Sequence, residues 1–233
     1  MLINLPFLLL ALVLLWFPRQ WLRLGFSFRR RRKRSSEVVI SRELEPWKTD
    51  EPGSRNVRFT VEFVKLRNYV DLLRATVGSV AIMGGFEIDP CLVAAPGASH
   101  TMIGRVLALR LAILLVGLLI QTTRYERRRL LFFAPIFYLF GLTIGLCGLQ
   151  TAAFAFVLIW SVNPLLKNPQ GFLLIYSILV GAFGFFFHDY ENGVEGPIAA
   201  FVFCYLPVLL SMLAQRPLVL FSRKSVRPPD AGS

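Results

Sequence analysis

The sequence predicts an all-α membrane protein, a polytopic transmembrane helix bundle of about six or seven spans behind a short polar N-terminal segment. Hydrophobic residues make up 55% of the 233 residues and the mean hydropathy is +0.58. Soluble domains have an apolar share of roughly 45 to 50%, and here the excess is gathered in long runs. Most basic residues lie in the segments between those runs. Short loops rich in Lys and Arg are retained in the cytoplasm, so these segments are predicted to be cytoplasmic.

The chain divides by composition into four parts. These are a membrane anchor at 1–17, a basic cytoplasmic segment at 18–71, a helix bundle at 72–214 and a basic tail at 215–233. Signal peptides carry positive charge before the apolar region, whereas here the charge follows it. Residues 1–17 are therefore predicted to be an uncleaved anchor with its N-terminus outside.

The segment at 18–71 begins with a dense basic block and then becomes mixed in charge. Apolar and polar residues alternate over 57–63, which predicts a half-buried strand. The following apolar positions approach helical spacing: Val64, Leu66, Tyr69, Val70 and Leu73. A strand and an amphipathic helix could lie on the membrane surface, bind a partner, or form a small cap on the bundle.

Segment lengths and charge together define the threading. Residues 105–121, 171–187 and 197–213 are each long enough to span, since about 30 Å of hydrocarbon needs roughly 20 helical residues and at least about 17. The run 130–166 is too long for one helix, so it is predicted to fold back at a turn over 148–151. The basic clusters at 29–34 and 124–129 are both predicted to be cytoplasmic, and the span 105–121 lies between them. A second crossing is therefore required between the clusters, and the weakly apolar segment 72–95 is the one available.

This threading predicts a multi-pass protein of the cytoplasmic (inner) membrane, with its N-terminus outside and its C-terminus inside. This threading places 24 of the 26 basic residues inside. Because the charge flanks apolar spans, its predicted partner is anionic lipid of the cytoplasmic face rather than nucleic acid. The expected headgroup contacts are Arg29, Arg30, Arg31, Arg32, Lys33, Arg34, Arg127, Arg128 and Arg129.

Four charged residues are predicted to lie at membrane depth. Glu87 and Asp89 precede a turn near residue 98, and Arg105 and Arg110 follow it at similar distances. Ionisable groups in a bilayer are costly unless paired or hydrated. The pattern favours structural ion pairs over a transport path, with Arg105 alternatively extending to the outer interface.

An outer loop carries His188, Asp189 and Glu191, residue types that serve metal binding and acid–base chemistry. Only one histidine lies there, and the other, His100, belongs to a different outer loop. No ligand spacing is present, so an acidic hydrated loop is the favoured interpretation. No metal, cofactor or catalytic residue is predicted, and Cys91, Cys147 and Cys204 form no redox motif.

Small residues recur at four-residue spacing in two spans, at Gly141 and Gly145 and at Ser177 and Gly181. Such positions let helices approach closely in lipid, so they are predicted to organise the bundle. The leading functional hypothesis is a non-catalytic membrane component that packs with lipids, a membrane partner or a second copy of itself. The alternatives are a small transporter or channel using the four intramembrane charges, and a lipid-acting enzyme with an outer site at His188, Asp189 and Glu191.

Overall fold

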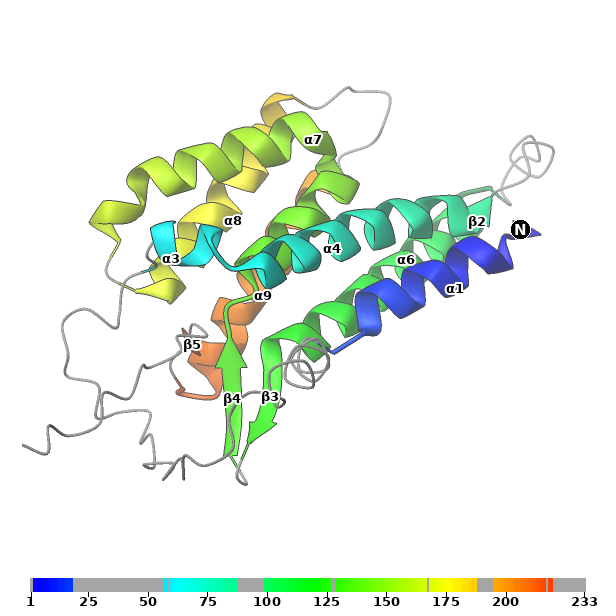
Figure 1. Ribbon diagram of the computed structural model, residues 1–233. Helices are drawn as coiled ribbons and strands as arrows, with labels where there is room; N and C mark the ends of the chain where they lie inside the picture. Colours follow the sequence, from blue (N-terminus) through cyan, green and yellow to red (C-terminus); the bar gives the residue numbers. More distant parts are fainter. Residues whose placement is uncertain are drawn as a thin grey trace, which may run out of the picture.

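The computed structural model describes residues 2–18, 57, 59–87, 99–126, 129–166, 168–187, 195–216 and 218–219. Within these residues the protein is mostly helical (Figure 1). The helices are α1 (Leu5–Trp16), α3 (Phe59–Phe63), α4 (Leu66–Gly85), α6 (Ser99–Thr122), α7 (Ile136–Val162), α8 (Pro169–Phe186) and α9 (Glu195–Leu213), with a 3₁₀ helix η2 (Asn163–Leu165).

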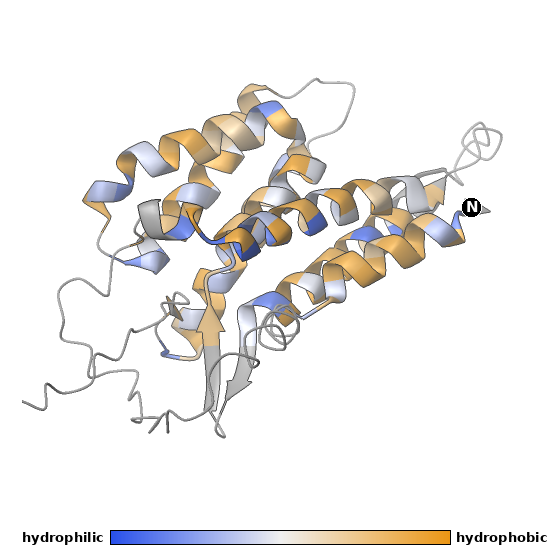
Figure 2. Ribbon diagram, viewed as in Figure 1, coloured by the Kyte–Doolittle hydropathy of each residue, from blue (hydrophilic) through white to orange (hydrophobic). Residues whose placement is uncertain are grey.

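Among the described residues, four segments are long and apolar enough to cross a membrane, as expected for a multi-pass membrane protein. They are Gly104–Thr122, Ile136–Leu165, Pro169–Phe186 and Glu195–Leu213. Figure 2 shows hydrophobic residues along most of their length, whereas hydrophilic positions gather near the N-terminal end of α4. Helix α1 is also apolar but shorter than these four.

The described residues are mostly helical, as predicted, but they also include short strands that the sequence did not predict. β1 (Leu2–Ile3) pairs antiparallel with β2 (Phe86–Glu87), and β3 (Thr123–Glu126) pairs antiparallel with β4 (Arg129–Phe133). β5 (Leu218–Val219) then joins β4 in parallel. The predicted fold-back run at 130–166 therefore begins in a strand, and its helix starts only after Pro135, which has no amide hydrogen to donate.

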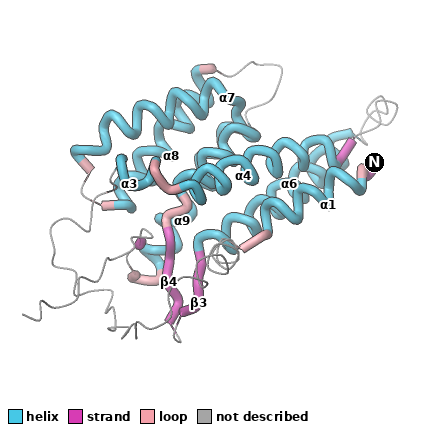
Figure 3. Tube along the Cα trace, viewed as in Figure 1, coloured by secondary structure: helices cyan, strands magenta, loops and turns pink. Residues whose placement is uncertain are grey.

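These strands mark two ends of the molecule (Figure 3). The β1 end contains β1 and β2, and the β3 end contains β3, β4, β5, the end of α1 and the start of α4. Helices α1 and α4 are antiparallel, because β1 pairs with β2 while the residues after α1 contact Arg74 in α4. The Trp16 indole also donates to the Ile113 carbonyl of α6 over 3.1 Å.

Helix α7 turns back at Gly148, as the length of the run predicts. Gly148 has φ 83° and ψ 163°, which breaks the helix into arms at 136–147 and 149–162. The Phe140 and Phe156 rings are stacked with centroids 4.0 Å apart. In a straight helix these residues would be separated by about 24 Å, so the two arms form a hairpin with Gly148 at its apex.

Helix α4 buries its polar face and exposes its apolar one. Asn68, Asp71, Arg74 and Ser79 are buried. The exposed positions are apolar and follow helical spacing: Leu66, Tyr69, Leu73, Val77 and Val80. The predicted amphipathic helix and the predicted crossing at 72–95 are thus one continuous helix as far as Gly85, with the opposite orientation to that of a water-soluble bundle.

The predicted strand at 57–63 is wrong, because residues 59–63 form helix α3. Phe59 and Phe63 are four residues apart and so share one helical face. Their rings lie 5.3 and 5.2 Å from Trp160, both in edge-on contact, and the Asn163 side-chain amide donates to the Val57 carbonyl over 2.6 Å. Tertiary aromatic packing against the second arm of α7 therefore determines the conformation of this short segment.

Candidate functional site

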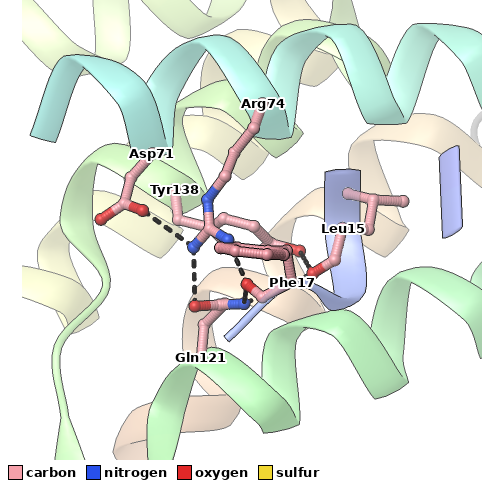
Figure 4. A network of polar contacts seen from close by, with 6 residues as sticks. All are labelled: Leu15, Phe17, Asp71, Arg74, Gln121 and Tyr138. Carbon is pink, nitrogen blue, oxygen red and sulfur yellow. Dashed lines mark hydrogen bonds and ion pairs between the residues drawn. The ribbon is translucent and has the colours of Figure 1, made fainter. Parts of the chain in front are cut away.

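The most extensive buried polar cluster among the described residues lies where α1, α4, α6 and the first arm of α7 meet at the β3 end (Figure 4). We call it the Arg74 network. It consists of the Asp71, Arg74, Gln121 and Tyr138 side chains together with the Leu15 and Phe17 main-chain carbonyls. All four side chains are 6% exposed or less.

Arg74 is the centre of the network. Its Nη2 lies 2.8 Å from Oδ1 of Asp71 and donates to Oε1 of Gln121 over 2.7 Å. Its Nη1 donates to the Phe17 carbonyl, and its guanidinium carbon lies 5.4 Å from the centroid of the Tyr138 ring. The carboxylate compensates the positive charge, so the buried group as a whole is close to neutral.

Gln121 links the arginine to the end of α1. Its Nε2 donates to the Phe17 carbonyl over 2.9 Å, while its Oε1 accepts from Arg74. The reversed amide orientation would place two donors against each other and two acceptors against each other. The Tyr138 hydroxyl donates to the Leu15 carbonyl over 3.2 Å and completes the set.

The network supplies hydrogen-bond donors to the Leu15 and Phe17 carbonyls at the end of α1. The last four carbonyls of a helix have no intrahelical partner, and α1 ends inside the bundle, where an unpaired polar group costs about 1 to 3 kcal/mol. A cation near a helix C-terminus also interacts favourably with the helix dipole. The arrangement joins α4, α6 and α7 around the end of α1.

Sequence reasoning misses this network because the charge pattern assigns Arg74 to the cytoplasmic bases. A usable signal is nevertheless present in α4. Asn68, Asp71, Arg74 and Ser79 share a helical face opposite an apolar stripe, and a polar face on a candidate membrane helix points toward the protein interior.

The two predicted intramembrane arginines point in different directions. Arg105 is exposed, whereas the Arg110 guanidinium donates to the Phe86 carbonyl over 2.6 Å and to the Met83 carbonyl over 2.9 Å. Arg110 thus binds carbonyls at the C-terminal end of α4. The Glu87 side chain and Asp89 lie outside the described residues, so their pairing with either arginine stays a prediction.

Other predicted site residues fall partly outside the described chain. This is so for residues 29–34, Arg127, Arg128, His188, Asp189 and Glu191, and for the side chains of Arg129 and His100. No group of three metal-ligating residues occurs in the part of the chain that the structure describes. Within the same part, Cys147 and Cys204 are free thiols.

The three predicted packing glycines of the two spans lie at close helix contacts. A Cβ at Gly141 would lie 2.6 Å from the Leu72 carbonyl oxygen, and one at Gly145 would lie 2.1 Å from Oγ of Ser79. Both therefore face α4. A Cβ at Gly181 would lie 3.2 Å from the Phe201 ring of α9, while the buried Ser177 hydroxyl donates to the Leu174 carbonyl of its own helix over 2.7 Å.

A scan against protein-family models and searches of curated proteins and of solved structures found no match.

Proposed function

We propose that this chain is a non-catalytic component of the inner membrane that crosses the bilayer about seven times and binds anionic lipid with its basic cytoplasmic face. The observation that carries the proposal is the orientation of α4. Its charged residues pair inside the bundle while Leu66, Leu73, Val77 and Val80 are exposed. Exposed apolar stripes are costly in water and favourable against acyl chains.

The positions of the helix ends support the threading. The described neighbours of each basic segment lie at the β3 end: Phe17 bonds Gln121, Val57 bonds Asn163, and β5 joins β4. We assign this end to the cytoplasm because the basic segments are continuous with it.

The apex of α7 supports two crossings rather than one kinked span. A Cβ at Gly196 would lie 2.4 Å from the Leu146 carbonyl oxygen. Leu146 is two residues before the apex, and Gly196 follows the polar loop that is predicted to lie outside. In the proposed threading, the apex and that loop therefore lie at a similar depth, at the outer surface of the membrane.

The transporter and enzyme alternatives depend on side chains outside the described residues, namely those of Glu87, Asp89, His188, Asp189 and Glu191. Arg105 is exposed, and Arg110 bonds carbonyls at the end of α4. We therefore do not propose either activity.

The proposal is tested by lipid analysis of the purified protein. The wild type should stay in the membrane after alkaline carbonate extraction and should co-purify with an excess of phosphatidylglycerol over its share in the membrane. Changing the six bases at 29–34 to Gln should abolish that excess, since each base near the surface contributes about 1 kcal/mol. A variant with Lys at all six positions keeps the charge, is the control and should retain the excess. Release by carbonate, or an unchanged excess in the Gln variant, would refute the proposal.

A further inference from the structure

Helices α6 and α9 enclose an apolar groove that the proposed lipid contact at the basic face does not use. Its volume is about 520 Å³. The walls include Leu111, Leu115, Ile198 and Val202, and Glu195 is the charged residue of the lining. Both helices are long and apolar enough to cross a membrane, so in the proposed threading the groove opens to the acyl chains.

The groove has one polar end. Glu195 lies in the first turn of α9, on the same helical face as Ile198 and Val202. On α6 the lining includes Ala108 and Ala112. Arg105 precedes them by three and seven residues, which places it on the same face one turn nearer the helix start.

Both charged residues are exposed. Glu195 lines the groove, and Arg105 lies one turn before the first lining residues of α6, so the groove is flanked by charges of opposite sign near the starts of the two lining stretches. The lining extends over about eight residues on each helix, a length of roughly 12 Å. In the proposed threading, this charged end of the groove lies at the depth of the outer-leaflet headgroups.

We propose that the groove binds one phospholipid of the outer leaflet whose headgroup carries a primary ammonium, as in phosphatidylethanolamine, with Arg105 on the phosphate and Glu195 on the ammonium. Guanidinium donors match phosphate oxygens bidentately. A primary ammonium has hydrogens to donate to the Glu195 carboxylate, whereas the quaternary ammonium of phosphatidylcholine has none. An acyl chain fills the space between Leu111, Leu115 and Val202.

This inference rests on the proposed function, since it needs a membrane-embedded bundle, but its lipid and its residues are different. The anionic-lipid site uses the bases at 29–34, and the groove uses Arg105 and Glu195. A wild-type protein that shows no enrichment of phosphatidylglycerol but prefers phosphatidylethanolamine in the groove would refute only the proposed function. A wild-type protein that shows the enrichment but no such preference would refute only the groove proposal.

The experiment titrates delipidated full-length protein in detergent with phospholipids of identical acyl chains and counts bound lipids by native mass spectrometry. The wild type should bind one phosphatidylethanolamine more tightly than phosphatidylcholine or phosphatidylglycerol. Successive N-methylation of the headgroup should weaken binding stepwise. Glu195→Gln should weaken ethanolamine binding by about threefold to tenfold, the range between an exposed ion pair and a charged hydrogen bond, and should remove the preference.

Two further variants locate the lipid. Arg105→Gln should weaken all three lipids alike, because all three carry the phosphate, and Ala112→Phe should do the same by filling the groove. Arg216→Gln, exposed at the other end of the bundle, is the matched control and should change nothing. Equal wild-type affinity across the methylation series, or full binding by Ala112→Phe, would overturn the proposal, and the methylation series needs no variant to fold.

Discussion

The Arg74 guanidinium donates a hydrogen bond at the end of α1, as water does at an exposed helix end. It donates to a carbonyl of the terminal turn, and through Gln121 it orients a second donor toward the same oxygen. Asp71, one turn before it in α4, supplies the compensating charge. Because each group depends on the others, the network is expected to respond to substitution as a unit.

Arg74→Leu should therefore be strongly destabilising. It removes the guanidinium that lies 2.8 Å from the buried Asp71 carboxylate, and breaking a buried pair on one side costs about 3 to 5 kcal/mol. The free energy of unfolding, measured by denaturant titration in detergent, should fall by that amount. The double variant Asp71→Asn, Arg74→Leu should recover part of the loss.

Arg105→Leu is the matched control for that measurement. Arg105 is exposed, so its removal should change the free energy of unfolding by no more than about 0.5 kcal/mol. An Arg74→Leu variant as stable as this control would contradict the capping role of the network.

Among the helices and strands, the hairpin of α7 shows where sequence reasoning succeeds. The length of the apolar run required a turn, and the polar residues after Gly148 located it. The strand predicted at 57–63 failed, because alternation over so few residues also fits a helix when positions four apart are aromatic. The deciding contacts of Phe59 and Phe63 with Trp160 join residues about 100 positions apart, and no local pattern encodes them.

Gly148→Ala tests the apex. No atom lies within 4 Å of the position that an added Cβ would occupy there, so space is not limiting, but φ is +83°. A side chain in such a conformation costs about 1 to 3 kcal/mol. The free energy of unfolding should fall accordingly.

Gly171→Ala is the control for the apex variant. It also has no atom within 4 Å of the added Cβ, but it lies inside helix α8. Alanine should be neutral or stabilising there by up to about 1 kcal/mol. Equal effects of the two substitutions would show that the positive φ of Gly148 is not required.

For the whole molecule, the composition of the sequence predicted a helical multi-pass membrane protein, and the mostly helical described residues, with four segments long and apolar enough to span, agree with it. Which segments share a side of the membrane stays a prediction from the charge distribution. Neither the two sheets among the described residues nor the burial of Arg74 was predicted from the sequence. Pairing of β1 with β2, and of β5 with β4, joins short segments far apart in the chain, and such segments carry too little pattern to be recognised.

Single-cysteine variants of a cysteine-free protein test the threading in sealed vesicles with a membrane-impermeant maleimide. Ser99→Cys, Gln150→Cys and Asn192→Cys should react from outside, and Ser35→Cys and Ala214→Cys only after permeabilisation. Thr122 is unsuitable as a reporter because it is fully buried. An unreactive Gln150→Cys would mean that the α7 hairpin stops within the bilayer, and an externally reactive Ala214→Cys would reject the orientation.

The parallel pairing of β5 with β4 imposes an order on biogenesis. Phe133 and Val219 are register partners, and translation at about 5 to 20 residues per second takes roughly 4 to 17 s to pass from one to the other. During that interval β4 has a free edge, which is a template for pairing with another chain. A nascent chain that stalls before residue 218 is therefore expected to recruit chaperones or proteases at the β4 edge, and the arrival of β5 ends that vulnerability.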